Sequence, residues 1–543
     1  MTATRREFVV TTSSAALAAC APFFRRRGAE VDVVIRGGTV FDGSLMASGI
    51  EGDVALDGGR VIAIGRRLAE SGRLEVDARG LAVSPGFIDV HSHGDNTLFA
   101  DPNAESMIRQ GVTTVVVGQD GSSRGPRTAA DEDSDRDSLR AFFDAVDQLP
   151  SAINVASMVG LGTVRGAVIG NENREATPAE MEKMVALVER ALVDGACGVS
   201  TGLEYTPGAF APLSELITLS APLARRRLPY STHMRNEDDT LLESIDESIA
   251  VARGAGCPLQ IAHLKTQGPR NWSKLDTVFS KVADARAAGI DAAFDRYPYL
   301  AYQTGLSNLF PVWARDGKPE DFLRRIDDPA TATRIRAYAE EKAALIGGWH
   351  NVQISSVSAA DDKPAEGMRL DDVARARGMA NYETAVALLK ANRASVGMVG
   401  FAMSEENLER ILTHPQAMVC SDGGSLAESG PARVGHPHPR GAGSFARVLA
   451  RYVRERKVLS LGAAIHKMSA LSAQRLHLQG RGVLRAGAFG DVVVFDPATV
   501  ADTATFANPF QYAVGVKAVF VNGAMAFLDG QRGARTGRAV RVG

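Results

Sequence analysis

The segment FIDVHSH, residues 87–93, is an apolar run that ends in two histidines one residue apart. In an extended strand, alternate side chains point to the same face. His91 and His93 are therefore expected to point the same way, with Cα atoms about 6–7 Å apart. Two imidazoles at that spacing suit a divalent cation, but an H-x-H pair by itself is a weak signal. Other strand ends must supply the remaining ligands.

Polar side chains follow three further strand-like runs. His233 comes after residues 228–232, His263 after residues 258–262, and Asp422 after residues 417–421. In a parallel α/β barrel, the carboxyl ends of the strands meet at one face, where active sites are built. Four histidines and one aspartate at four such ends predict a site for one or two zinc-like ions.

The central part of the chain alternates between two sequence patterns. From residue 87 to about residue 480, short apolar runs such as 111–117 and 154–159 alternate with helical stretches such as 178–193 and 240–255. This alternation predicts an α/β fold with a (β/α)8, TIM-like barrel. Residues of about 310–375 are charged and hold few strand-like runs, so we expect an insertion there.

Both ends of the chain are rich in short strands. Residues 53–64 form a predicted β-hairpin around Gly58 and Gly59, and Asn522-Gly523 is a hairpin turn between two apolar runs. The two ends, residues 28–86 and 481–543, are therefore predicted to pair into one small β-sandwich domain beside a barrel of residues 87–480.

Composition excludes several classes of protein. The chain has 543 residues, of which 45% are hydrophobic and 23% are charged, and its formal net charge is −2. Bulk disorder and a nucleic-acid partner are therefore not expected. The four cysteines form no C-x-x-C pair, which excludes a cysteine-based zinc finger. No apolar run has the ~20 residues that a membrane span needs.

The first residues have the pattern of an export signal. Arg5-Arg6 is followed by Phe8 and by an apolar run that ends in Leu17-Ala18-Ala19-Cys20. The arginine pair is typical of a twin-arginine signal, and the last four residues resemble a lipobox. We expect residues 1–27 to direct export to the periplasm. Cys20 is either lipidated, which makes the protein a membrane-anchored lipoprotein, or lies beside an ordinary cleavage site.

Five stretches together resemble one family. They are PGFIDVHSH (85–93), GVTTVV (111–116), STGLEY (200–205), HPR (438–440) and VVFDPATV (493–500). With them the chain resembles the amidohydrolase superfamily and, within it, the N-acyl-D-amino-acid deacylases, over most of its length from about residue 30. The resemblance implies that His233 and His263 bind the tighter zinc, that His91 and His93 contribute to a weaker second site, and that Asp422 is the catalytic acid and base.

The sequence departs from the family pattern at two positions. The family usually has a cysteine zinc ligand in a Gly-Asn-Cys-Gly stretch, and Asp120 stands in the place of that cysteine. A carboxylate can also bind or bridge zinc, through a harder oxygen donor. The alternative is that Asp120 is only a turn residue before Gly121. Leu161 lies where relatives often have a histidine that contacts the ligands or the substrate.

The resemblance also implies a mechanism. Zinc-bound hydroxide attacks the acyl carbonyl, and Asp422 passes the proton of the water to the leaving nitrogen. A cation must bind the α-carboxylate of the substrate. The candidate substrate-binding residues are Lys265, Arg296, Tyr297, Glu204 and Arg440. Lys265 and Arg296 have structural ion pairs as their alternative role, and Glu204 has a structural hydrogen bond.

The leading hypothesis is a zinc-dependent hydrolase, with one or two Zn²⁺ ions, that removes the N-acyl group from N-acyl-D-amino acids. One alternative is a cyclic-amide hydrolase of the dihydroorotase or hydantoinase type, which usually bridges two metals with a carboxylated lysine. Another is a D-configured dipeptidase. The alternative outside enzymes is a metal- or solute-binding envelope protein. The expected partner is a small amide, and the sequence indicates no oligomeric state.

Overall fold

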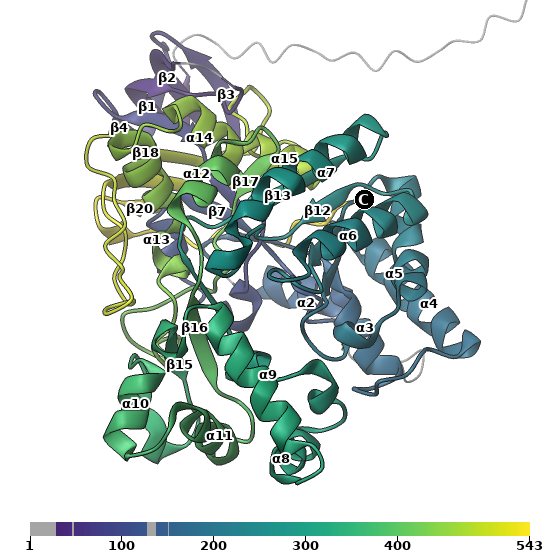
Figure 1. The fold of residues 1–543 in the computed structure, drawn as a ribbon. Helices are drawn as coiled ribbons and strands as arrows, with labels where there is room; N and C mark the ends of the chain where they lie inside the picture. Colours follow the sequence, from purple (N-terminus) through teal and green to yellow (C-terminus); the bar gives the residue numbers. More distant parts are fainter. Residues whose placement is uncertain (1–28, 46–47, 127–136, 150) are drawn as a thin grey trace, which may run out of the picture.

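The structure is a computed structural model of the chain that describes residues 29–45, 48–126, 137–149 and 151–543 (Figure 1). The export signal predicted for residues 1–27, with Cys20, lies outside the described residues. Within the described ranges, no helix is long and apolar enough to cross a membrane.

Parallel strands form two arcs in the centre of the molecule. One arc has the order β6 (Phe87–Asp89), β7 (Val112–Val117), β8 (Asn154–Ser157). The other has the order β9 (Val159–Gly160), β10 (Val199–Gly202), β11 (Tyr230–His233), β12 (Leu259–Ile261), β13 (Ala292–Arg296), β17 (Ala417–Val419). Only Met158 separates β8 from β9, and a parallel bridge between Ser92 and Gly423 joins the ends of β6 and β17. The arcs thus close into the predicted barrel.

Helices cover the outside of this barrel. They include α2 (Leu139–Gln148), α3 (Leu161–Val168), α4 (Pro178–Asp194), α5 (Leu213–Ser220), α6 (Leu241–Ala255), α7 (Leu275–Ala287), α12 (Glu405–Thr413), α13 (Arg440–Arg447), α14 (Leu461–Met468) and α15 (Ala470–Arg475). Local sequence explains the limits of α4. Thr177 and Glu180 form a capping box with Pro178 in the first turn, and Gly195 ends the helix at φ 111°. The predictions of helices at 178–193 and 240–255 are confirmed to within one residue.

Strands from both chain ends form one nine-stranded sheet. Its strands are β1 (Glu30–Val40), β2 (Ile50–Asp57), β3 (Arg60–Gly65), β4 (Ser71–Asp77), β5 (Ala82–Pro85), β18 (Val492–Phe495), β19 (Val516–Val521), β20 (Ala524–Leu528) and β21 (Gln531–Arg532). The β2–β3 and β19–β20 hairpins are antiparallel, as predicted from their glycine turns. Antiparallel pairing of β5 with β18 joins the two ends, which lie together in Figure 1.

A second α/β unit lies between β13 and β17. Its antiparallel sheet consists of β14 (Ala301–Gly305), β16 (Gly397–Phe401) and β15 (Val352–Ser356). The helices are α8 (Pro319–Asp327), α9 (Ala332–Leu345), α10 (Leu370–Arg377) and α11 (Asn381–Ala391). Figure 1 shows this unit away from the nine-stranded sheet, at the lower edge. It extends beyond the predicted insertion of about 310–375 on both sides, because the strands that bound it pair with each other across nearly a hundred residues.

The C-terminal tail packs against the start of β8. Asn154 is fully buried and donates to the carbonyl oxygen of Thr113 at 3.1 Å. Its side-chain oxygen accepts from the Asn522 side chain at 2.8 Å and from the Arg538 backbone N–H at 3.1 Å. One amide thus connects the barrel to the nine-stranded sheet and to the tail.

We predict that Asn154→Ala lowers the free energy of unfolding by about 2–4 kcal/mol, because the buried Thr113 carbonyl and the partly buried donors of Asn522 and Arg538 lose this partner. Metal content should not change, since Asn154 begins its strand and therefore lies at the barrel face opposite the strand ends. Urea unfolding and metal analysis check both. Asn508→Ala, at an exposed asparagine, is the control, and an equally small loss in both variants would contradict the prediction.

Candidate metal centre

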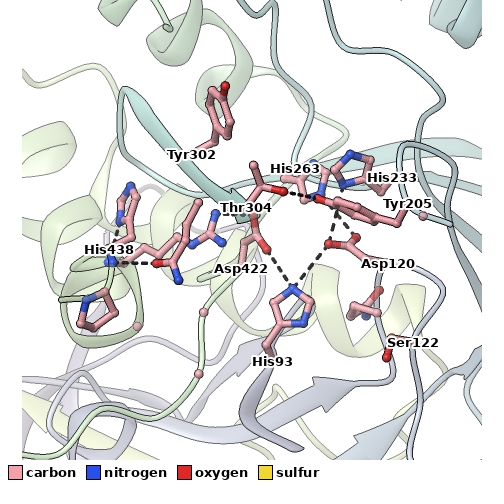
Figure 2. Close-up of a pocket in the computed structure, with 18 of the residues that line it drawn as sticks. His93, Asp120, Ser122, Tyr205, His233, His263, Tyr302, Thr304, Asp422 and His438 are labelled. Atoms are coloured by element: carbon pink, nitrogen blue, oxygen red, sulfur yellow. Dashed lines mark hydrogen bonds and ion pairs between the residues drawn. The ribbon is translucent and has the colours of Figure 1, made fainter. Parts of the chain in front are cut away.

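The predicted ligands converge at the carboxyl ends of the barrel strands. His91 and His93 follow β6, Asp120 follows β7, His233 ends β11, His263 follows β12 and Asp422 follows β17. His93, Asp120, His233, His263 and Asp422 line a cavity of about 720 Å³ (Figure 2), and His91 is fully buried. The structure therefore brings all six side chains together from strands that are far apart in the sequence.

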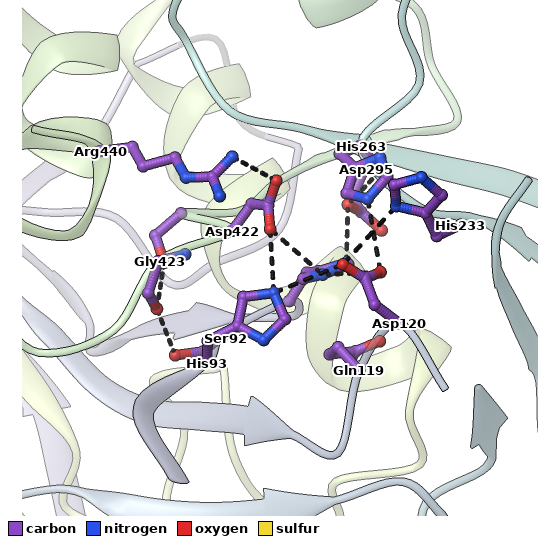
Figure 3. Close-up of polar contacts among 12 residues, drawn as sticks. Ser92, His93, Gln119, Asp120, His233, His263, Asp295, Asp422, Gly423 and Arg440 are labelled. Carbon is purple, nitrogen blue, oxygen red and sulfur yellow. Dashed lines mark hydrogen bonds and ion pairs between the residues drawn. The ribbon is translucent and has the colours of Figure 1, made fainter. Parts of the chain in front are cut away.

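Asp120 lies at the centre of this cluster. Its Oδ1 is 3.3 Å from Nε2 of His91 and 3.4 Å from Nε2 of His263. Its Oδ2 is 3.4 Å from Nε2 of His93 and 3.7 Å from Nδ1 of His233. The carboxylate thus faces four imidazoles, of which Figure 3 labels those of His93, His233 and His263.

Asp422 completes the other side of the cluster. Its Oδ1 lies 3.1 Å from Nε2 of His93 and 3.5 Å from Nε2 of His91. Its Oδ2 accepts a hydrogen bond of 2.5 Å from Nη1 of Arg440. Burial by itself would raise the pKa of Asp422, but the charges of Arg440 and His263 lower it well below its ordinary value. Asp422 is therefore ionised and has one oxygen directed at the histidines.

These residues fit one or two divalent cations. The buried atoms without a hydrogen-bond partner include both ring nitrogens of His91, Oδ1 of Asp120 and Nδ1 of His233. Buried polar atoms are almost always paired, so four such atoms in one cluster indicate a ligand. The side chains form two groups of potential ligands, His91, His93, Asp120 and Asp422 in one, and Asp120, His233 and His263 in the other.

Three of the potential ligands have a left-handed backbone. The φ angles are 52° at Asp120, 35° at His263 and 51° at Asp422. Such conformations are costly for residues other than glycine and persist only where neighbours fix them. The backbone N–H of His263 donates to Asp295 at 2.8 Å, and that of Asp422 donates to the His91 carbonyl at 2.8 Å. The strand ends turn sharply at these points and direct the side chains to one place.

Glu237 is a central residue that the sequence analysis missed. It is almost fully buried, both of its oxygens accept from Nζ of Lys265 at 2.6 Å, and Oε1 lies 3.1 Å from Nδ1 of His263. A carboxylate on the second ring nitrogen of a histidine orients the ring toward a metal. Its place four residues after His233 is the only sequence signal that could have indicated this role.

The predicted substrate-binding residues have different surroundings. Tyr297 and Arg440 line the cavity, and the Tyr297 hydroxyl is buried without a partner. Lys265 also lines it but pairs with Glu237. Glu204 lines the cavity with its Oε2 3.5 Å from Nε2 of His233. Arg296 does not reach the cavity. Its guanidinium donates to the Tyr299 carbonyl at 2.8 Å and lies 4.2 Å from the centre of the Tyr297 ring.

Two further positions have structural roles. His438 donates from Nε2 to the Ala301 carbonyl at 3.0 Å, and its Nδ1 accepts from the Arg440 backbone at 3.0 Å, which fixes the start of α13. Leu161 is buried in the hydrophobic core, while its neighbours Gly162 and Thr163 line the cavity.

Comparison with known proteins gives a consistent result. Residues 74–527 match a family model described as the amidohydrolase family. The chain is 35% identical to a D-aminoacylase of Alcaligenes xylosoxydans xylosoxydans over 91% of this chain and 94% of that protein. It is 36% identical to an N-acyl-D-aspartate deacylase of the same organism over 93% of each chain.

A solved structure is also similar. It is the N-acyl-D-glutamate deacylase of Bordetella bronchiseptica, complexed with zinc and a phosphonate inhibitor that mimics the tetrahedral intermediate. The TM-score is 0.81 at 35% identity, and the match covers 94% of this chain and 100% of the other.

We predict that metal affinity rises steeply with pH. Burial would lower the pKa of His93, but hydrogen bonds to Asp120 and Asp422 raise it to about 10. Burial likewise opposes the charges of Glu237 and Asp120, which raise the pKa of His233 to about 10. The two histidines belong to different ligand groups, so a cation in either group must displace one of these protons below that pH. Its affinity should therefore increase roughly 10-fold per pH unit between pH 6 and 8. Competition with a chromophoric chelator measures this, and an affinity independent of pH would contradict it.

Proposed function

The chain belongs to the amidohydrolase family, and from that membership we propose that it removes the N-acyl group from N-acyl-D-amino acids in a metal-dependent reaction. The observation that carries the proposal is the convergence of Tyr297 and Arg440 on the cavity that holds the ligand cluster. Cationic and hydroxyl donors beside such a cluster suit a substrate that has a carboxylate next to its scissile amide.

The carboxylate would bind on the wall formed by Tyr297 and Arg440. The Tyr297 hydroxyl is buried and has no partner, and the Arg440 guanidinium lies 4.9 Å from the centre of the Tyr297 ring. Arg440 uses Nη1 for Asp422, so its other N–H groups are candidates to donate to the substrate. Arg296 stacks on the same ring from within the protein and positions Tyr297.

Asp422 is the proposed proton carrier. Its low pKa keeps it ionised at neutral pH, so it can accept the proton of the attacking water. It can then deliver that proton to the nitrogen of the leaving amino acid, which departs poorly without it. A divalent cation held by the ligand cluster would polarise the acyl carbonyl and lower the pKa of a bound water. We propose zinc as one ion that serves, which the zinc-containing Bordetella relative supports.

The residues at the metal centre favour a linear amide over a cyclic amide as the substrate. Asp120 belongs to both groups, and Lys265 pairs with Glu237 at 2.6 Å. Neither residue supports the carboxylated lysine bridge expected of a dihydroorotase or hydantoinase. The names of the relatives, a D-aminoacylase and an N-acyl-D-aspartate deacylase, support the D configuration. Glu204 in the cavity wall makes aminoacyl-D-amino acids worth testing beside N-acyl ones.

The place of action is a separate proposal. The arginine pair at Arg5-Arg6 and the run that ends at Cys20 support export to the periplasm, with lipidation of Cys20 as an additional step. Mass spectrometry of the mature N-terminus tests both.

The substrate proposal predicts release of free amino acid from N-acetyl-D-amino acids and not from their L-enantiomers. Chelation should abolish the release, and a divalent cation should restore it. Amino acid release is measured across panels of N-acetyl-D-amino acids, N-acetyl-L-amino acids, aminoacyl-D-amino acids and hydantoins. Activity on hydantoins alone, or on L-enantiomers alone, would overturn the proposal.

We predict that Asp422→Asn lowers kcat at least 100-fold, because the amide cannot accept the proton. Metal content is measured in the same samples, since Asp422 also faces the histidines. Loss of turnover with retained metal is the expected result. Asp239→Asn, at an exposed carboxylate that binds Arg270, is the control for the change of charge. Turnover within tenfold of the unchanged protein, with metal retained, would exclude this role of Asp422.

A further inference from the structure

We propose that Asp120 is a carboxylate bridge between two cation sites and that it makes the centre favour hard divalent cations. The ratio of Cd²⁺ affinity to Mn²⁺ affinity is then smaller than it would be with a thiolate at position 120. The inference rests on the proposed function only for the identity of this cluster as a metal centre. It goes beyond that function by assigning ion selectivity to one residue.

The geometry of the carboxylate indicates a bridge. Each oxygen faces one histidine of each ligand group: Oδ1 faces His91 and His263, at 3.3 and 3.4 Å. Oδ2 faces His93 and His233, at 3.4 and 3.7 Å. Asp120 is also the one residue that both ligand groups share among the described residues. A monodentate ligand of a single ion would not need to face both pairs of histidines.

Asp120 does not behave as a turn residue. An aspartate that stabilises a turn accepts a hydrogen bond from a backbone N–H just after it. The next three N–H groups all have other acceptors. Gly121 donates to Oγ of Ser200 at 3.1 Å, Ser122 to the Gln119 carbonyl at 2.9 Å, and Ser123 to Oγ1 of Thr163 at 2.9 Å. The Asp120 carboxylate is therefore available to the histidines and to the cations that they bind.

The loop holds Asp120 rigidly. The Gln119 side chain donates to the Val90 carbonyl at 2.9 Å and so connects the loop to the strand end that precedes His91. On the other side, a Cβ on Gly202 would lie 2.2 Å from the Asp120 carbonyl oxygen, so the two loops are in direct contact. These contacts fix the backbone at position 120 without using its side chain, so a substituted side chain would begin at the same point.

The donor set contains nitrogen and oxygen alone. Both groups consist of histidines and aspartates, and the described cysteines, Cys197, Cys257 and Cys420, are buried outside them. Thiolates select soft ions, whereas carboxylates suit Mn²⁺ and other hard ions. The order of affinities still places Zn²⁺ above Mn²⁺ in such a site. The inference therefore concerns the ratio of affinities, which the identity of the bridging atom sets.

The test measures ion binding by the metal-free full-length protein, with Mn²⁺, Zn²⁺ and Cd²⁺ each added alone. Calorimetry gives affinity and stoichiometry for the unchanged protein and for Asp120→Cys, Asp120→Asn and Asp239→Asn. We expect Asp120→Cys to raise the ratio of Cd²⁺ to Mn²⁺ affinity at least tenfold. Asp120→Asn should weaken binding of both ions at least tenfold. Asp239→Asn removes the charge of an exposed carboxylate that belongs to neither ligand group, and should change affinities less than threefold.

Two spectra add evidence that does not depend on affinities. The unchanged protein loaded with two Mn²⁺ ions should give the electron paramagnetic resonance signal of a spin-coupled pair. With Co²⁺, a thiolate charge-transfer band should appear in Asp120→Cys and be absent from the unchanged protein. The Mn²⁺ spectrum needs no variant, so an uncoupled pair would overturn the bridge even if a variant fails to fold.

Three results would overturn the inference. They are an unchanged Cd²⁺ to Mn²⁺ ratio in folded Asp120→Cys, Asp120→Asn affinities as close to normal as those of Asp239→Asn, or uncoupled Mn²⁺ ions in the unchanged protein. None of these measurements uses a substrate. An inactive protein that passes them would contradict the proposed function alone, whereas an active protein that fails them would contradict only the role of Asp120.

Discussion

The hydrogen bond from the Asp422 backbone N–H to the His91 carbonyl, at 2.8 Å, is the contact on which the site depends. Together with the bridge between Ser92 and Gly423 it joins the first barrel strand to the last, across more than three hundred residues. Because the ring closes there, ligands at the beginning and near the end of the barrel become neighbours. Asp89 strengthens the same junction, because its buried carboxylate accepts a hydrogen bond from the Ser421 backbone N–H at 2.9 Å.

Closing the barrel also concentrates charge, and the surrounding residues balance it. Asp422 pairs with Arg440, and Glu237 pairs with Lys265, in both cases with little contact with water. An unpaired buried carboxylate would be costly, so each cation stabilises the ionised form of its partner. Among the described residues, the ion-pair partners of Asp120 within 4 Å are all imidazoles. Its negative charge is therefore available to a bound cation. This explains why its neighbours include the buried atoms without hydrogen-bond partners.

Local patterns predicted most of the ligand positions, because a polar residue after a short apolar run marks a strand end wherever the strand lies. His233, His263 and Asp422 could be found in this way. The direction of the side chains after each strand end could not, since it depends on the loop backbone. Lys265 was expected to bind substrate because strand alternation places it beside His263. Lys265 does lie beside His263, with Nζ 2.7 Å from Nδ1 of the ring, but its ion pair with Glu237 could not be predicted, because His263 has φ 35° and the alternation ends there. The extent of the second α/β unit could not be predicted either, because its bounding strands β14 and β16 pair with each other across nearly a hundred residues.

The residue at position 120 can change while the barrel does not, because contacts of other groups fix the loop. The loop that contains Asp120 is fixed through the side chain of Gln119, the backbone of Gly121 and the contact with Gly202. None of these contacts uses the Asp120 carboxylate. The fold therefore directs the side chain at position 120 toward four histidines without specifying its donor atom. A carboxylate brings two hard oxygens to that point, where a thiolate would bring one soft sulfur, so a single side chain sets the chemistry of the centre independently of the architecture that positions it.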